Sequence, residues 1–294
     1  MARVDVARLR AEFTGPHEVV RASDGRMLFL RRWDAAGEAP VSLLLFHGIT
    51  GHSGAYGAPL AEPLAQAGVT VFGMDLRGHG LSDGIRGDYP SPARFASDIS
   101  ETVAFVKARS RRLVVLGHSL GALSAVAAAK SRPRDIDGVV LLSAGRRIRM
   151  ERYQRPGPGA LLKTLLGVTL LRGTPLIEYR REGMLGLDDP LFNFRYSARF
   201  YSVLYGVPAG RLLRMLRTGV LDSPNLHFEE PLRVPLLLAV GDQDELISVD
   251  SARELGDGIG ASDKELRVIP GARHAVFPKG STDPVREWLA RKCS

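Results

Sequence analysis

The residues Gly117-His118-Ser119-Leu120-Gly121 form a G-x-S-x-G motif, and the segments on either side of it give it a structural context. The apolar run 113–116 before the motif is typical of a buried strand, and the alanine-rich run 122–130 after it favours a helix. A serine on such a tight strand-to-helix turn has a strained backbone that lifts its hydroxyl clear of the sheet. The motif therefore predicts that Ser119 is a nucleophile, and a glycine-rich turn with an incidental serine is the alternative.

A histidine late in the chain could activate this serine. A serine hydroxyl is a weak nucleophile and needs a base, which is normally a neutral histidine held by a carboxylate. After a G-x-S-x-G motif, the acid and then the histidine follow along the chain, each on a loop after a late strand. His274 follows the strand expected over 265–269 and is the only histidine after the last strands. We therefore predict that His274 is the base.

The acid of the predicted triad lies in the loop after the strand expected over 234–240. Asp242, Asp244 and Glu245 all follow this strand, and position alone allows any of them. We favour Asp244, because it lies far enough past Gly241 to cross the strand end toward a neighbouring loop. Asp242 is better suited to capping the turn. The sequence thus predicts a Ser119, Asp244 and His274 triad.

Backbone N–H groups must stabilise the negative oxygen that forms during attack on a carbonyl. The N–H of Leu120, directly after the nucleophile and at a helix start, is one candidate. The second should follow the strand over 41–46, where Gly48 lets the chain turn close to the substrate and Ile49 supplies the N–H. We predict that Ile49 and Leu120 form the oxyanion hole.

Four further histidines have more ordinary interpretations. We expect His47 and His118 to brace the two loops, with His118 also a candidate substrate contact. His52 lies near the expected mouth of the site and is a second candidate substrate contact. His79 is expected to stabilise a turn. Because their spacing matches no metal-binding motif, we predict no metal site and no cofactor.

The elements that must position these residues alternate between apolar strands and helices. This pattern predicts an α/β fold with a mostly parallel central sheet covered by helices on both faces. The first two strands, around the turn at 23–25, are expected to form a hairpin. We expect strands over 18–22, 27–33, 41–46, 69–74, 113–116, 139–142, 234–240 and 265–269, and helices over 59–67, 92–109, 122–130 and 283–292.

The alternation stops over residues 145–230, which we interpret as a mainly helical cap inserted into a core of residues 1–144 and 231–294. Helices are expected over 161–171 and 211–216. Leucines in the first of these segments need apolar surface to pack against, which argues against a disordered linker.

Several motifs in this order carry a family resemblance. They are His47-Gly48, Arg77-Gly78-His79-Gly80-x-Ser82-x-Gly84, Arg86-Gly87-Asp88-Tyr89-Pro90-Ser91, the Ser119 motif, Gly241-x-x-Asp244 and His274. With them the chain resembles the α/β-hydrolases of the monoacylglycerol lipase and lysophospholipase-like group, sometimes filed as serine aminopeptidase-like hydrolases. The resemblance covers about residues 17–145 and 231–292 and is weak across the insertion. One departure is Ala122, where many relatives carry a second glycine.

The resemblance implies an α/β-hydrolase fold and a serine hydrolase that cleaves carboxylic esters through an acyl-enzyme on Ser119. Monoacylglycerols, lysophospholipids and small esters are the implied substrate classes. An acyltransferase with the same acyl-enzyme is the alternative, and a non-catalytic binding protein of this fold is a third. The family's cap shapes an acyl tunnel, so aromatic side chains such as Phe200 and Tyr201 are candidate substrate contacts. For most aromatic residues of the insertion, we favour the alternative that they only pack the cap against the core.

Charge and composition limit which binding partners and which cellular compartment we expect for this chain. The net charge is +8, but the basic residues are scattered and no nucleic-acid motif occurs, so we expect no nucleic-acid binding. Five arginines cluster where the insertion begins: Arg146, Arg147, Arg149, Arg152 and Arg155. We favour a solvated loop for them, and transient contact with an anionic head group or a membrane surface is the alternative. Cys293 is the one cysteine, and neither a signal peptide nor a transmembrane run is visible. We expect a cytoplasmic protein, and the sequence does not predict an oligomeric state.

Overall fold

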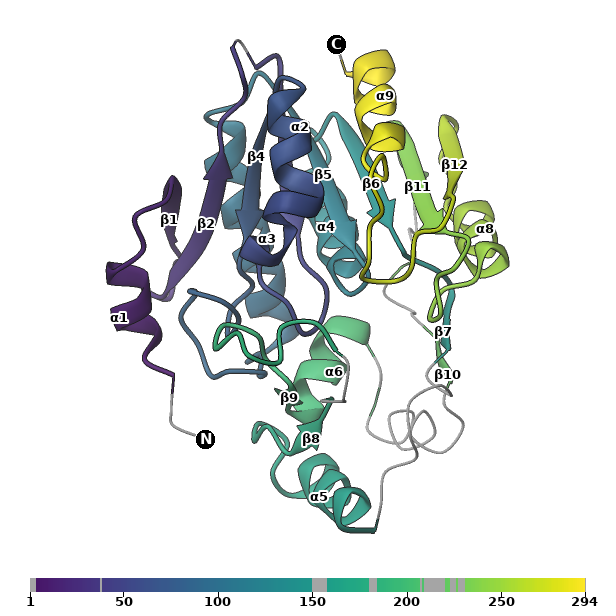
Figure 1. Ribbon diagram of the computed structural model, residues 1–294. Helices are drawn as coiled ribbons and strands as arrows, with labels where there is room; N and C mark the ends of the chain where they lie inside the picture. The colour runs from purple at the N-terminus through teal and green to yellow at the C-terminus, as the bar shows by residue number, and fades with distance from the viewer. Residues whose placement is uncertain are drawn as a thin grey trace.

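The computed structural model describes residues 4–37, 39–149, 158–179, 184–206, 208, 220–222, 226 and 231–293. Its centre is an eight-stranded sheet in the order β1-β2-β4-β3-β5-β6-β11-β12 (Figure 1). The six strands from β4 to β12 run parallel, and β2 pairs antiparallel both with β4 and with β1. The strands are β1 (His17–Arg21), β2 (Met27–Trp33), β3 (Val41–Phe46), β4 (Val69–Met74), β5 (Arg112–His118), β6 (Gly138–Leu142), β11 (Leu236–Gly241) and β12 (Lys264–Ile269).

Helices cover both faces of this sheet. Helices α3 (Pro92–Lys107), α4 (Gly121–Ser131) and α8 (Val249–Gly258) pack on one face, and α2 (Glu62–Gln66) and α9 (Asp283–Lys292) on the other. The central strands are apolar on both faces, so alternate residues of one strand enter different layers. In β3, Leu43 and Leu45 join the layer under α2 and α9, while Leu44 and Phe46 join the other. The predicted mostly parallel sheet with helices on both faces is confirmed.

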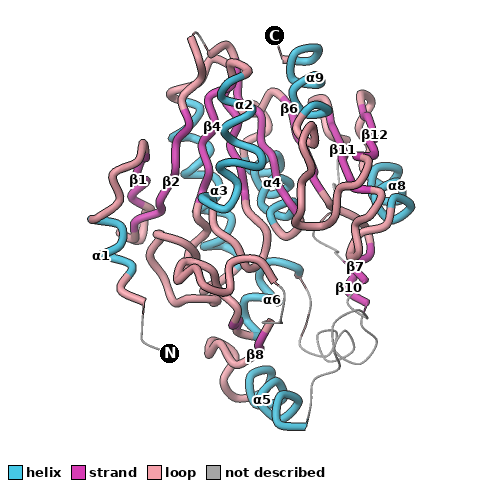
Figure 2. The backbone as a smooth tube through the Cα atoms, viewed as in Figure 1, coloured by secondary structure: helices cyan, strands magenta, loops and turns pink. Residues whose placement is uncertain are grey.

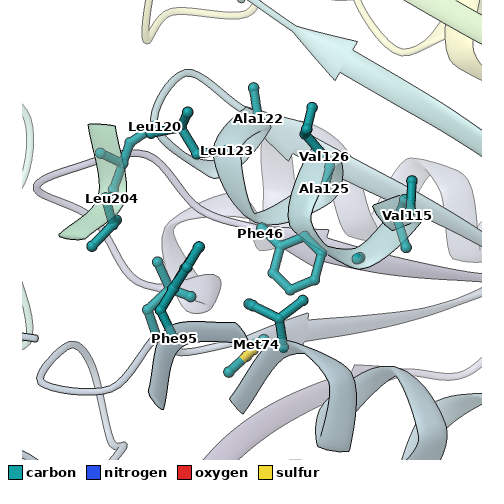
Figure 3. Close-up of a cluster of buried hydrophobic side chains, with 14 of the residues drawn as sticks. Phe46, Met74, Phe95, Val115, Leu120, Ala122, Leu123, Ala125, Val126 and Leu204 are labelled. Carbon is teal, nitrogen blue, oxygen red and sulfur yellow. The ribbon is translucent and has the colours of Figure 1, made fainter. Parts of the chain in front are cut away.

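The layer under α3 and α4 extends to the elements around the predicted nucleophile. Phe46 and Met74, at the ends of two neighbouring strands, belong to one buried cluster with the small residues Ala122 and Ala125 of α4 (Figure 3). Small residues on α4 let the helix approach the sheet closely. Leu204, from the insertion, reaches the same cluster, so the insertion shares part of the core.

The described part of residues 145–230 lies beyond the carboxyl ends of the parallel strands (Figure 2). The chain leaves β6 at Leu142, and it returns to the sheet at β11. Two helices and two small antiparallel sheets occur in this part; they are α5 (Pro158–Thr169), α6 (Ala198–Tyr205), β7 (Arg147–Arg149) with β10 (Val220–Asp222), and β8 (Ile177–Glu178) with β9 (Arg195–Tyr196). The strands are too short to be visible as a sequence pattern. The helix predicted over 211–216 lies outside the described residues.

Two core helices were not predicted from the sequence. Helix α1 (Val6–Ala11) begins at Asp5, whose side chain accepts a hydrogen bond from the N–H of Arg8. It buries no residue, and Arg10 pairs with Asp83 of a distant loop, so tertiary contacts hold it in place. Helix α8 buries Ser251, Ala252, Leu255 and Gly256, of which only Leu255 is a large apolar side chain. No described helix has the length and apolar character that a membrane-spanning segment needs.

Candidate active site

Ser119 lies on the sharp turn between β5 and α4. Its φ is +54°, in the left-handed region that a side chain rarely adopts, and its N–H donates to the carbonyl of Leu142 at 2.9 Å. A Cβ on Gly117 would lie 2.2 Å from the carbonyl oxygen of Gly121, and a Cβ on Gly121 would lie 2.1 Å from that of Phe46. Only glycine fits at both positions, because strand and helix approach each other so closely. The turn therefore holds the serine hydroxyl beyond the strand end.

The structure brings the three predicted triad residues together. His274 Nε2 lies 2.8 Å from Ser119 Oγ, and His274 Nδ1 lies 3.0 and 3.1 Å from the two carboxylate oxygens of Asp244. Since an ionised carboxylate only accepts, Nδ1 carries the proton when the imidazole is neutral. Nε2 is then an acceptor and faces the Ser119 hydroxyl. This arrangement suits removal of the serine proton.

Asp244 is held as an ionised carboxylate. Burial alone would raise its pKa, but the hydrogen bond with His274 and two backbone N–H groups outweigh burial, and the pKa lies below its ordinary value. Those backbone donors are Leu246 and Ile247, each 2.9 Å from Oδ1. A lowered pKa keeps the charge that would stabilise the protonated histidine.

The two competing carboxylates serve the neighbouring turns. Asp242 Oδ1 accepts from the N–H of Gly271 at 2.8 Å, and Asp242 is exposed. Glu245 Oε2 accepts from the N–H of His274 at 3.2 Å. Of the three acids that the sequence left open, Asp244 is the one whose carboxylate reaches the imidazole of His274.

The two predicted oxyanion donors are free. Among the described residues, neither the N–H of Ile49 nor that of Leu120 has a hydrogen-bond acceptor. His47 holds the peptide that carries the Ile49 N–H, because its Nδ1 lies 2.7 Å from the carbonyl of Gly48 and its Nε2 accepts from the N–H of Leu76 at 3.1 Å. Burial lowers the pKa of His47 to about 4, so the ring is neutral and Nδ1–H is the donor.

The other predicted substrate contacts are engaged elsewhere. His52 Nε2 lies 3.0 Å from Asp189 Oδ2 and its ring packs edge-on against Phe192, so His52 joins the core to the insertion. Phe200 and Tyr201 of α6 are buried among aromatic rings of the core cluster. Both nitrogens of His118 are hydrogen-bonded to protein. A direct role in substrate binding stays a prediction for all four.

A narrow cavity opens on Ser119. It holds only about 10 Å³, roughly the room that one water molecule needs. Its lining is mostly apolar and comes from both the core and the insertion: Ser119, Leu123, Ser143, Ala144, Gly145, Ile148, Tyr205, Leu226 and Ile247. The sequence did not indicate that these side chains meet. A larger hollow of about 790 Å³ lies between β2 and α2, and no triad residue lines it.

A short core segment fastens the insertion, and we call Arg86, Gly87 and Asp88 the cap anchor. The Arg86 guanidinium donates to the backbone carbonyls of Leu191 and Phe192 at 2.6 and 3.1 Å. Asp88 is buried, and its carboxylate accepts from the Ser197 hydroxyl at 2.5 Å and from the guanidinium of Arg199. These bonds place the segment 191–199, and with it α6, next to the site.

The structure offers no sign of a metal centre in the residues that it describes. No group of three or more His, Cys, Asp or Glu side chains in this part of the chain could hold a metal ion. The absence of a metal and of a cofactor stays a prediction.

Comparisons with known proteins agree with this geometry. A family model described as serine aminopeptidase, S33, matches residues 37–279. The chain is 29% identical over 253 residues to a monoacylglycerol lipase of Mycolicibacterium smegmatis, which covers 84% of this chain and 87% of the relative. It is 28% identical over 274 residues to the monoglyceride lipase of Rattus norvegicus, with 89% and 83% covered.

Solved structures extend the likeness to the whole fold. A monoacylglycerol lipase of Paleococcus ferrophilus superposes with a TM-score of 0.62 at 25% identity, covering 90% of this chain and 99% of that one. A soluble variant of the Saccharomyces cerevisiae monoglyceride lipase superposes with a TM-score of 0.71 at 18% identity, covering 96% and 97%. The relatives support the prediction of a carboxylic-ester hydrolase. Since the family model spans most of the chain, the protein belongs to the serine aminopeptidase S33 family of α/β-hydrolases.

Proposed function

We propose that this protein hydrolyses carboxylic esters through an acyl-enzyme on Ser119. The observation that carries the proposal is the continuous hydrogen-bond chain from Ser119 Oγ through His274 to Asp244. His274 Nε2 takes the serine proton while Oγ attacks the ester carbonyl. The free N–H groups of Ile49 and Leu120 stabilise the oxyanion, each by roughly 3 kcal/mol.

The same histidine completes the reaction. His274 donates the proton that it took from Ser119 to the leaving alcohol, and the acyl group stays on Ser119. A water molecule then gives a proton to His274 and attacks the acyl carbonyl. His274 passes that proton to Ser119 Oγ as the bond to the acyl group breaks, which releases the acid and restores the serine. Asp244 stabilises the imidazolium in both halves of the cycle.

The substrate is an ester with an apolar acyl chain, as the relatives named monoacylglycerol lipases suggest. Residues 145–230 act as a cap whose side chains Ile148, Tyr205 and Leu226 face the cavity at Ser119. Because that cavity has room for about one water molecule, an acyl chain has to displace cap side chains to enter. Monoacylglycerols, lysophospholipids and small esters all remain in this class.

Contact with a lipid surface would bring such substrates to the cap. Large apolar side chains are exposed on and after α5, including Leu162 (58% exposed), Leu165 (47%) and Leu170 (78%). Exposed leucines beside Lys163 and Arg172 suit transient contact with an anionic bilayer. In the predicted basic cluster, Arg147 pairs with Glu254, and Arg152 and Arg155 lie outside the described residues.

Hydrolysis of p-nitrophenyl esters from acetyl to palmitoyl tests the proposal, with Ser119→Ala as the matched variant. We expect the protein to hydrolyse a band of chain lengths and Ser119→Ala to lose kcat by up to about a millionfold. Activity retained in Ser119→Ala would refute the acyl-enzyme. If a fluorophosphonate labels Ser119 but no ester is hydrolysed, the site selects a more specialised substrate and the acyltransferase alternative becomes the favoured one. Product partition with an added alcohol or amine then measures acyl transfer.

A further inference from the structure

Tyr56 connects three loops of the site through one hydroxyl group. Tyr56 lies at the end of the 3-10 turn Ser53–Tyr56 and is buried. The N–H of Gly48 donates to its hydroxyl oxygen at 2.9 Å, and that oxygen lies 2.6 Å from His118 Nδ1. His118 Nε2 lies 2.7 Å from the backbone carbonyl oxygen of His274. The chain of bonds therefore runs from the oxyanion loop to the loop of the base.

The direction of each bond follows from elementary chemistry. The His274 carbonyl can only accept, so His118 carries its proton on Nε2. Burial, aided by the nearby imidazole of His274, lowers the pKa of His118 to about 3, so Nδ1 is bare and accepts. Burial raises the pKa of Tyr56, which keeps its hydroxyl protonated and able to donate. Every donor in this chain thus meets an acceptor. The direction of the hydrogen bonds cannot be reversed without breaking one of them.

Each end of this chain adjoins a group that acts in the proposed reaction. Gly48 precedes Ile49, whose N–H is the proposed oxyanion donor, and His118 precedes Ser119. The carbonyl of His274 belongs to the residue whose imidazole takes the serine proton. We propose that Tyr56 is a positioning residue, which through His118 fixes the oxyanion donor and the base relative to Ser119. The inference rests on the proposed function, because it assigns a role within that reaction.

The effect should appear in the transition state and not in substrate binding. A substrate carbonyl hydrogen-bonds weakly to the oxyanion hole, whereas the tetrahedral intermediate depends on donors that are already aligned. Loss of the Tyr56 hydroxyl leaves His118 Nδ1 without a donor and the Gly48 N–H without an acceptor. Both loops then gain freedom while the apolar ring of residue 56 still fills its place.

Tyr56→Phe tests the proposal, and Tyr89→Phe is the matched control. Tyr89 is equally buried and donates to Asp98 at 2.7 Å, in the layer under α3 and outside the triad. We expect Tyr56→Phe to lower kcat about 10- to 100-fold with KM within about twofold, somewhat less than direct loss of an oxyanion donor. The inhibition constant of an alkyl boronic acid, which forms a tetrahedral adduct on the serine, should rise by the same factor. Tyr89→Phe should lower the melting temperature but leave kcat and the inhibition constant of the boronic acid nearly unchanged.

The possible results separate this inference from the proposed function. If Ser119→Ala is inactive but Tyr56→Phe keeps the kcat of the wild type, the positioning role is refuted and the acyl-enzyme stands. If Tyr89→Phe loses as much kcat as Tyr56→Phe at equal loss of stability, the effect is structural and the role is also refuted. If Ser119→Ala remains active, the proposed function itself fails.

Discussion

The catalytic core and the cap handle their polar and apolar groups in opposite ways. In the core site, His47, His118 and Asp244 are buried and each bonds to fixed partners, so their orientations are set before a substrate arrives. In the insertion, α5 exposes leucines to solvent, and the cavity that the insertion helps to line holds only about 10 Å³. The core site therefore fixes its polar groups, whereas α5 leaves apolar surface uncovered.

The two regions meet at the cap anchor, where buried polar side chains of the core form hydrogen bonds with the insertion. Arg86 and Asp88 bind the segment 191–199, and His52 binds Asp189 just before it. Helix α5 lies farther from this attachment (Figure 1). The exposed leucines therefore lie on a part of the insertion for which the structure gives no direct bond to the cap anchor. Experiments that change one region at a time can break or sharpen this contrast.

The largest effect should come from the core carboxylate. We expect Asp244→Asn to lower kcat about 10⁴-fold, because an amide favours the wrong tautomer of His274 and cannot stabilise the imidazolium. Asp242→Asn is the control, since Asp242 only caps a turn, and its kcat should stay within about threefold. Ester hydrolysis at pH 8 measures both. Equal losses would mean that the acid had been assigned to the wrong residue.

The second largest effect should be a loss of unfolding free energy at acidic pH. Burial lowers the pKa of His47 to about 4 and that of His118 to about 3, from about 6.5 in the unfolded chain. Below pH 6.5 the unfolded state therefore binds more protons, so stability falls as the pH falls toward the folded values. Between pH 7 and 5 each residue should cost about 2 kcal/mol of unfolding free energy.

Urea denaturation at the two pH values measures this loss. Burial also lowers the pKa of His79 well below its ordinary value, so His118→Gln should remove roughly a third of the dependence. Substitution of His17, which is exposed on β1, serves as the control. A stability that does not change between pH 7 and 5 would contradict the neutral, buried histidines on which the bond directions depend.

The attachment of the cap should have an intermediate effect. We expect Asp88→Ala to lower the unfolding free energy by about 1–3 kcal/mol, because it leaves the Ser197 hydroxyl and the Arg199 guanidinium without their acceptor. Asp135→Ala, which removes a surface pair with Arg132, should cost less than about 1 kcal/mol. If Asp88→Ala weakens kcat/KM for octanoyl more than for acetyl esters, the anchor shapes the path of the acyl chain. An equal loss of kcat/KM for octanoyl and acetyl esters would mean that the cap anchor contributes to stability only.

The smallest effect on the folded protein should come from the exposed leucines. Leu165→Gln with Leu170→Gln should change the unfolding free energy by less than about 0.5 kcal/mol, as for other surface positions. Hydrolysis of soluble acetyl esters should not change. Co-sedimentation with vesicles that contain anionic lipid should fall several-fold, and unchanged co-sedimentation would remove the lipid-surface role from α5.

Much of the site could be predicted because its signals are local. The strand, the turn and the helix around Ser119 are adjacent in the chain, and glycines at 117 and 121 mark the close approach. The order of the acid and the base follows from the parallel strands, because their carboxyl ends meet at one edge of the sheet. Asp244 and His274 could therefore be named before any distance was known.

Other parts of the site depend on contacts between residues that are far apart in the sequence, and no local sequence pattern predicts such contacts. Tyr56 and His118 are 62 positions apart, and His52 and Asp189 are 137 apart. Arg86 and Asp88 were visible as a family motif, but their bonds to the segment 191–199 carry no signature in the sequence. Ile148, Tyr205 and Leu226 line the cavity only because the cap folds back over the strand ends.

The sequence by itself determined most elements of the core, the nucleophile turn and the order of the predicted triad, because strand and helix patterns and glycine positions act over a few residues. The tertiary structure alone decided which hydroxyl contacts the predicted oxyanion loop and which side chains of the insertion line the cavity at Ser119. Those choices depend on the distance and orientation of groups that are far apart in the chain. Only close packing of the folded chain sets such distances.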